Sequence, residues 1–209
     1  MFDFNNVVNS EEELRNLVGY PSELVNHKVI HHLDSHCSDF ISLSPLVFIS
    51  SSDDQGFCDV SPRGDAPGFV YILDDKRIVI PERPGNRRMD TLRNIIKNPK
   101  VGLIFLIPGL EETLRINGQA QIIKDSELLL HMQVNGKVPL LGIGILIEEC
   151  YVHCAKAFKR SSVWDANSWV NKDKLPNVAR MISAHAKQIG LSEEEVSKAL
   201  HESYTKRLY

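Results

Sequence analysis

The sequence has no apolar run that approaches the roughly 20 residues of a transmembrane helix, so it predicts no membrane partner. Residues 1–6 contain neither the basic segment nor the apolar core of a secretory signal. Four cysteines, at positions 37, 58, 150 and 154, are too few and too irregularly spaced for a disulfide framework. Together these absences predict a cytoplasmic protein in a reducing compartment.

The sequence also lacks net positive charge. The formal net charge is −3, which argues against the broad basic face of a nucleic-acid-binding protein, so we expect no nucleic-acid partner. No glycine-rich loop has the spacing of a dinucleotide site, and no serine lies in a nucleophile-elbow sequence. A doubly wound dinucleotide-binding fold and a serine hydrolase are therefore not expected.

The 209 residues have the composition of an ordinary globular protein, with 43% hydrophobic and 24% charged residues. Residues 1–45 predict an N-terminal helical segment, with a capping box at Ser10 and Glu13 and a second helix near 23–33. Residues 46–165 predict a strand-rich domain, and residues 166–209 a helical appendage with a capping box at Ser192 and Glu195.

Within 46–165, alternating and apolar runs predict about six strands in hairpins, and Gly118 is a candidate β-bulge. Seven ranges are candidates for these strands, near 47–50, 57–61, 69–73, 77–80, 101–107, 112–123 and 143–153, and helices are expected at 86–97 and 125–132. Strands of this number without a strand–helix rhythm predict an α+β fold whose antiparallel sheet closes into a barrel.

The segment between residues 77 and 97 carries the main signal for function. An apolar strand ends at Pro81, and a helix-like spacing of apolar residues begins near Asn86. Arg87 and Arg88 then fall in the first helical turn, where the helix already presents unpaired N–H groups and partial positive charge. A bound phosphate would remove this conflict, with Asn86 as N-cap or as a further donor. The alternative is a solvated basic turn paired with Glu82 or Asp90.

Two further segments carry candidate anion ligands. Ser61 and Arg63 follow a strand and could face the same phosphate, although Pro62 and Gly64 also fit a simple turn. Lys156, Lys159 and Arg160 next to Trp164 could form a wall of cations and one aromatic ring. The composition of residues 61–68 predicts a loop.

Metal sites are considered at two places and expected at neither. Cys150 and Cys154 would lie on one face of a strand while His153 lies on the other, and two cysteines four residues apart are poorly placed for chelation. His32 and His36 could share a helix face near Asp34, but no matching second cluster is evident.

Several motifs, in this order, resemble the pyridoxamine 5′-phosphate oxidase-like family, over roughly residues 35 to 170. They are Phe40–Pro45, Asp59–Asp65, Ile80–Arg88, Asn98–Phe105, Leu114–Gly118 and His153–Ala157. Within the family the chain is similar to a bacterial subgroup of largely unassigned substrate. The resemblance implies a six-stranded split barrel, a homodimer, and FMN held at the dimer interface.

The resemblance also implies roles for individual residues. Arg87 and Arg88 match the family's Arg-Lys pair that holds the FMN phosphate, and Asn86 matches the serine before that pair. Ile80 and Pro81 match the strand end beside the ribityl chain and ring. The remaining matches are Ser61 and Arg63 along the isoalloxazine, Thr113 at a flavin-contacting glutamine, and Lys156, Arg160 and Trp164 near the flavin of the partner subunit.

The chain departs from the oxidase at its C-terminal part, where two expected helices precede Tyr204–Tyr209 and the family's Arg-x-His segment is missing. That segment helps the oxidase to bind its substrate. We therefore expect an FMN-dependent oxidoreductase that acts on an unidentified small molecule. A non-enzymatic FMN carrier or sensor and a true pyridoxamine 5′-phosphate oxidase are the alternatives, and haem binding through His153 or His131 is a minor one.

Overall fold

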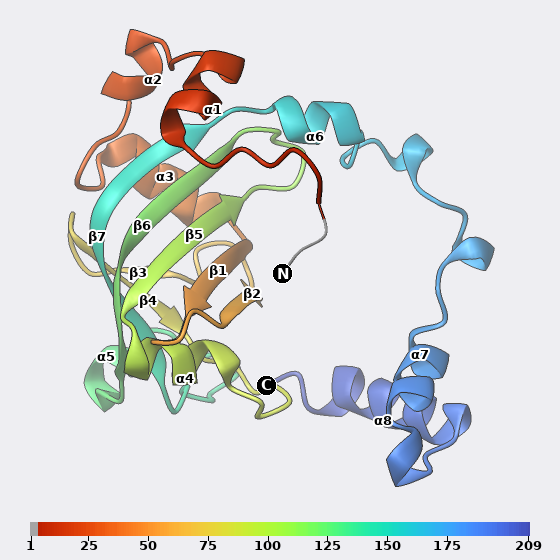
Figure 1. The fold of residues 1–209 in the computed structure, drawn as a ribbon. Helices are drawn as coiled ribbons and strands as arrows, with labels where there is room; N and C mark the ends of the chain where they lie inside the picture. The colour runs from red at the N-terminus through yellow and green to blue at the C-terminus, as the bar shows by residue number, and fades with distance from the viewer. Residues whose placement is uncertain (1–3) are drawn as a thin grey trace.

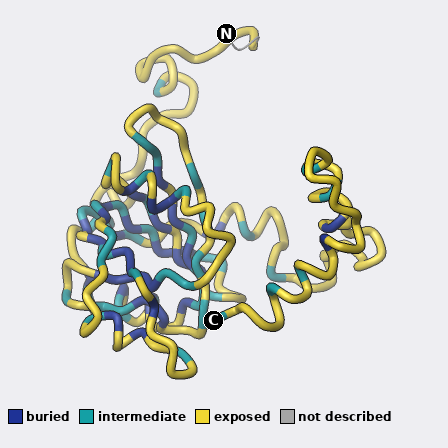
Figure 2. The backbone as a smooth tube through the Cα atoms, turned by 90° about the horizontal axis from the view of Figure 1, so that it is seen from below, coloured by how far each residue is buried: buried dark blue, intermediate teal, exposed yellow. Residues whose placement is uncertain are grey.

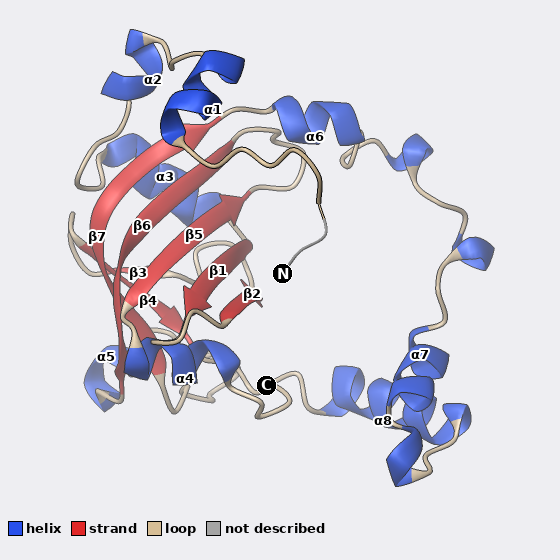
Figure 3. Cartoon of the chain, viewed as in Figure 1, coloured by secondary structure: helices blue, strands red, loops and turns tan. Residues whose placement is uncertain are grey.

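Seven antiparallel strands form one strongly curved sheet in the computed structural model, which describes residues 4–209 (Figure 1). The strand order is β2-β1-β5-β6-β7-β4-β3. The strands are β1 Leu46–Ser52, β2 Cys58–Gly64, β3 Tyr71–Ile72, β4 Arg77–Pro81, β5 Lys100–Leu106, β6 Thr113–Ile123 and β7 Gly142–His153. The predicted α+β fold is confirmed, and the sheet curls into a split barrel with helices around it (Figure 3).

The strand count differs slightly from the expected six. Six strands have five or more residues, and the seventh, β3, has two residues at the sheet edge beside β4. Its partners are Tyr71 with Val79 and Ile72 with Ile78. β3 is thus a short addition to the barrel and leaves the arrangement of the six long strands unchanged.

Buried residues concentrate on the strands of the curved sheet (Figure 2), and their apolar side chains form the hydrophobic core. Side chains alternate along each strand, so every second residue of β1, β5, β6 and β7 points inward. The fully buried core residues include Ile49, Phe105, Leu114, Ile116 and Ile145. Helix α4, Asp90–Lys97, closes one opening of the barrel by placing Leu92 and Ile95 in this core.

The bulge predicted at Gly118 is confirmed, because the β6–β7 register shifts between Asn117 and Gly118. A Cβ atom at Gly118 would lie 2.2 Å from the backbone oxygen of Leu146. Only glycine therefore lets the two strands approach at this point.

The N-terminal helices are α1 Glu11–Val18, α2 Glu23–His27 and α3 Ser35–Leu43. The predicted Ser10 cap of α1 is confirmed, since its side chain accepts from the Glu13 N–H. The Glu13 carboxylate bonds the Asn9 N–H rather than that of Ser10. The helix expected over 23–33 ends earlier, at His27, and Asp34 caps a separate helix, α3.

The C-terminal part forms an arm. Helix α5, Ser126–Leu130, precedes β7; α6, Lys156–Ser161, follows it, and an exposed linker then leads to α7 Val178–His185 and α8 Glu193–Lys206. The capping box predicted at Ser192 and Glu195 is confirmed. α7 and α8 pack on each other and stand away from the barrel (Figure 1). Across residues 4–209, no helix has the length and apolar character needed to cross a membrane.

Candidate functional site

The two arginines of the predicted anion site lie before α4 and not in its first turn. α4 begins at Asp90, and its N-cap is Met89, in a left-handed conformation with φ 59°. Arg87 is also left-handed, with φ 61°, which a helix does not allow. The Asn86 side chain accepts from the Arg88 N–H at 3.0 Å, and this local turn competes with helix formation. The predicted helix start at Asn86, and its role as N-cap, are therefore wrong.

This arrangement leaves the N-terminus of α4 without a side-chain cap, because Met89 has no suitable acceptor. Non-glycine residues with left-handed backbone are uncommon and concentrate at functional segments. Two of them, Arg87 and Met89, lie within three residues here. An anion could take the place of the missing cap.

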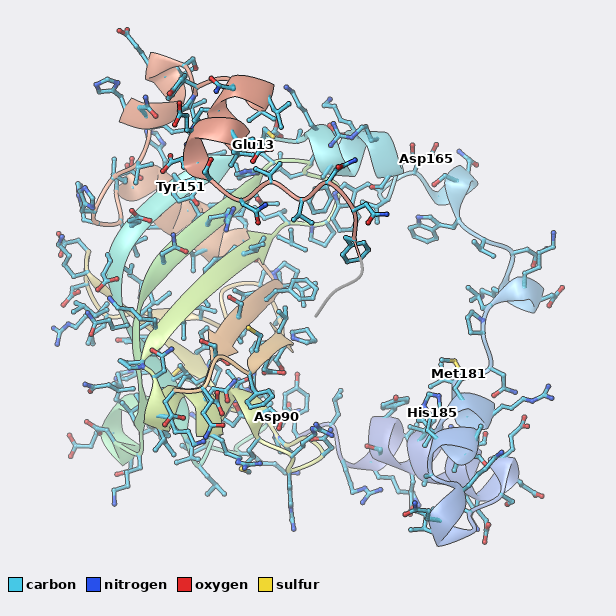
Figure 4. The ribbon with its side chains drawn as sticks, in the orientation of Figure 1. Glu13, Asp90, Tyr151, Asp165, Met181 and His185 are labelled. Carbon is cyan, nitrogen blue, oxygen red and sulfur yellow. The ribbon has the colours of Figure 1, made fainter. Side chains whose placement is uncertain are left out.

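The two arginines differ in whether their charge is already paired with an acidic side chain. The Arg88 Nε donates to the carboxylate of Asp90 although its side chain is 76% exposed, so the alternative of a turn paired with an acid holds for this residue. Arg87 is exposed, and within residues 4–209 its side chain forms no ion pair or hydrogen bond. Figure 4 labels Asp90 at the start of α4. Arg87 is therefore the cation that is free for a ligand.

The inward face of β2 lies along the whole segment from Glu82 to Thr91. At one end Thr91 donates its hydroxyl hydrogen to Asp59, at 2.6 Å. At the other, Arg63 pairs with Glu82, and Arg83 pairs with Asp65 at 2.7 Å. These contacts join β2, at one edge of the sheet, to the chain that leaves β4 near the other edge.

The structure therefore brings Ser61 and Arg63 to the same segment as Arg87 and Arg88. Asp59, Ser61 and Arg63 alternate with exposed residues along β2 and share its inward face. Residues 61–64 form the end of this strand, so the loop predicted from residue 61 starts later. Pro62 is tolerated because β2 is an edge strand.

Polar groups at this junction lack partners. The Arg63 side chain is only 14% exposed, and its Nε is buried without a hydrogen bond. Among the described residues, the Ser61 hydroxyl has no hydrogen-bond partner either. A buried donor without a partner is rare in proteins. The junction therefore offers donors to a ligand that carries an anionic group and hydrogen-bonding oxygens.

Ile80 and Pro81 end β4 and are buried, and the Ile80 side chain belongs to the core. They form the wall behind the segment, so a ligand there would meet mainly their backbone. Thr113 is also buried, at 5% exposure, and pairs with His153 at the far end of β7.

Lys156 and Arg160 lie on the short helix α6, and Trp164 follows it. The Trp164 Nε1 donates to the Leu110 oxygen at 2.9 Å, and its ring stacks on Phe158. Pro81 pairs with Gly142 at one end of β7, whereas α6 follows His153 at the other. The 12 residues of β7 span roughly 36 Å, so one chain does not bring these residues to Arg87.

The sequence reasoning missed the acids that organise the junction. Asp65 accepts from Arg83 and, at 2.7 Å, from the Tyr209 hydroxyl, and its side chain is 2% exposed. Burial acts to raise the pKa of Asp65, but hydrogen bonds from Tyr209, the Ala66 N–H and Arg83 outweigh it and lower the pKa below its usual 3.8. The spacing of Asp59, Ser61, Arg63 and Asp65, every second residue, could have indicated that these polar side chains share one face. No pattern in the sequence indicates the contact between Asp65 and Tyr209.

Two hollows lie at the ends of this junction, one beside Asp65 and Arg83 and the other beside Asp59. One, of about 170 Å³, is lined by residues that include Asp65, Arg83 and the stacked pair Tyr71 and His131. The larger, of about 470 Å³, lies beside β1, β2, β5 and β6, and its lining includes Arg115. None of the predicted site residues lines either one.

The histidine and cysteine clusters do not assemble. Over the described part of the chain, no group of three or more His, Cys, Asp or Glu side chains is placed to hold a metal ion. Cys150 is buried in the core while His153 and Cys154 are exposed. The Asp34 side chain caps α3 by accepting from the Cys37 N–H.

Comparison with known proteins gives one family match. Residues 33–154 match the family model described as pyridoxamine 5′-phosphate oxidase. No curated protein matches the chain. Among solved structures, HupZ from Group A Streptococcus is 20% identical, with 57% of this chain and 93% of that chain covered and a TM-score of 0.47.

Two other solved structures are similar at the same level. A candidate pyridoxamine 5′-phosphate oxidase from Lactobacillus delbrueckii is 19% identical, with 58% and 95% of the two chains covered and a TM-score of 0.47. General Stress Protein 26 from Bacillus anthracis is 16% identical, with 55% and 88% covered and a TM-score of 0.43.

Proposed function

This chain belongs to the pyridoxamine 5′-phosphate oxidase family, and from that premise we propose that it binds FMN and acts as an FMN-dependent oxidoreductase on a small molecule. The observation that carries the proposal is the junction of β2 with residues 82–91. There the uncapped start of α4 and the unpaired Arg87 belong to the same segment as Glu82, the partner of Arg63, whose Nε is unsatisfied.

Different residues of the junction would bind different parts of the cofactor. Arg87 and the first N–H groups of α4 would hold the phosphate. Arg88 would also bind the phosphate once its ion pair with Asp90 is broken. Asn86 keeps this turn in shape through its bond to the Arg88 N–H. Ser61 and Arg63 would meet the ribityl chain and ring edge, with the Ile80–Pro81 backbone behind them. The bound flavin would supply the electron transfer, and the protein binding and orientation.

A homodimer with FMN at its interface completes the proposal. Thr113, Lys156, Arg160 and Trp164 lie at the other end of β7 from Pro81, so they can reach the same cofactor only from a second chain. Apolar side chains exposed on and just before β2 support such a contact, with Phe57 at 70% and Val60 at 65% exposure. Burying such side chains is a main driving force of association.

The phosphate role is tested by comparing FMN with riboflavin, which lacks the phosphate. Arg87→Ala should weaken FMN binding by about 1.5–3 kcal/mol, on the order of ten- to a hundredfold. Arg88→Ala should weaken it less, because Arg88 must first give up Asp90. Fluorescence titration of both ligands measures the change, with Arg180→Ala in α7 as the matched control. Equal losses for FMN and riboflavin would contradict the phosphate contact.

The oxidoreductase role is tested separately from binding. Purified protein should show the visible absorption of a flavin, and NAD(P)H should bleach it, with reoxidation when an acceptor is added. If bound FMN resists every reductant, the protein is a flavin carrier rather than an enzyme. Formation of pyridoxal phosphate from pyridoxamine phosphate would identify a true oxidase.

A further inference from the structure

Two buried thiols face each other between α3 and β7. The Sγ atoms of Cys37, on α3, and Cys150, on β7, lie 3.4 Å apart, with the Cys150 thiol donating to Cys37. Cys150 is completely buried, and Cys37 retains 7% exposure. The other two cysteines, Cys58 and Cys154, are exposed and separate.

The two sulfurs are held in place by different elements. Cys37 lies in the first turn of α3, where its N–H donates to the Asp34 cap at 2.8 Å. Cys150 exchanges backbone hydrogen bonds with Ile30, at 3.0 and 2.7 Å. The chain before α3 is thus already attached to β7 at Cys150, so the two thiols can approach without large movement.

The environments of the two thiols are unequal. The hydrogen bond from Cys150 lowers the pKa of Cys37 and outweighs the opposing effect of burial. The same bond, together with burial, raises the pKa of Cys150. A first-turn position also favours the thiolate at Cys37 because of the helix dipole. Cys37 therefore has the character of an attacking sulfur, and Cys150 that of a neighbour held as thiol.

We propose that Cys37 and Cys150 form an oxidative modification site that hydrogen peroxide converts to a disulfide. The Cys37 thiolate attacks one peroxide oxygen, the O–O bond breaks, and the sulfenic acid of Cys37 forms while the other oxygen leaves as water. The Cys150 sulfur then attacks the Cys37 sulfur, the S–O bond breaks, and a second water leaves. Two thiols are oxidised to one disulfide, and one peroxide is reduced to two waters.

Access and geometry favour this route over others. A peroxide is small enough to reach the slightly exposed Cys37, and Cys150 needs no solvent access because it reacts within the protein. The bond would join residues 113 positions apart and fix α3 to β7. Crosslinks that close long loops restrict the unfolded chain strongly. The proposal needs no bound flavin.

The experiment uses the full chain carrying Cys58→Ser and Cys154→Ser, so that only the two buried thiols remain. Peroxide at stoichiometric concentration should lower the intact mass by two hydrogen atoms and raise the melting temperature by several degrees. Dithiothreitol should reverse both changes. Adding Cys150→Ser should instead give a mass gain of one oxygen, because the sulfenic acid finds no second thiol.

Peptide mapping of the unmutated protein after treatment with peroxide and alkylation tests the proposal without relying on variants that could misfold. A crosslinked peptide pair that contains Cys37 and Cys150 is the expected product. Two free, alkylated thiols at these positions would overturn the proposal, and so would oxygen added to either one without a crosslink.

Discussion

Gly118 is the residue at which the barrel tolerates the least change. A Cβ atom there would meet the Leu146 oxygen at 2.2 Å, and a backbone oxygen cannot move aside as the end of a long side chain can. Gly118→Ala should therefore lower the free energy of unfolding by about 1–3 kcal/mol through overpacking between β6 and β7. Urea unfolding followed by fluorescence measures the loss.

Gly85→Ala is the matched control for that substitution. No atom lies within 4 Å of a Cβ built at Gly85, and its φ is outside the left-handed region. Its stability should stay within about 0.5 kcal/mol of the unmutated protein, or rise slightly as glycine freedom in the unfolded chain is lost. If both variants lose stability equally, the close approach at the bulge is not the cause.

The junction between β2 and the segment after β4 is the element whose stability depends on acid. Asp65 holds Arg83 and Tyr209, and its pKa in the folded protein lies below the usual 3.8. Below about pH 4 the unfolded chain therefore binds a proton at this position that the folded chain does not. Stability from Asp65 is present above that pH and is lost as pH falls towards the folded pKa.

Asp65→Asn should remove this part of the acid sensitivity and should also lower stability at pH 7. The cost should be about 3 kcal/mol, because Arg83, at 16% exposure, would lose its charged partner. Thermal unfolding between pH 2 and 7 measures both effects, with Asp75→Asn, an exposed carboxylate, as control. An unchanged pH profile in Asp65→Asn would contradict the role of the ion pair.

Sequence patterns that span a few residues predicted most helices and strands of this fold, but not the contacts between them. Two-residue alternation indicated the strands, and Ser10 and Ser192 marked two helix starts, because caps and pleats act within a few residues. The start of α4 was predicted too early. The spacing of apolar residues does not reveal the turn at Asn86 or the left-handed backbone of Arg87 and Met89, which delay the helix.

The candidate site was predicted in part. The sequence singled out both segments of the junction, since each concentrates arginines beside turn-forming residues. It did not reveal that Arg63 and Arg83 are paired with Glu82 and Asp65, because those pairs join opposite edges of the sheet. Nor did it indicate Tyr209, which lies 144 residues from Asp65 in the chain.

At the scale of the whole molecule, the two halves of the proposed flavin site lie at opposite ends of the barrel. α6 follows one end of β7, and Pro81, which leads to the arginine segment, pairs with the other end (Figure 1). A homodimer therefore has to combine the arginines of one chain with α6 of the other. Light scattering should give twice the 23.6 kDa of the chain.

Mixed dimers test this arrangement directly. One variant carries Arg87→Ala with Arg88→Ala, the other Lys156→Ala with Arg160→Ala, and each alone should bind FMN at least tenfold more weakly. Co-expression with two different tags allows the mixed dimer to be isolated. If the halves come from different chains, that dimer contains one intact site and one doubly damaged site, so FMN titration should show one site of full affinity per dimer. If both halves belonged to one chain, every site would carry one defect, and no site of full affinity would appear.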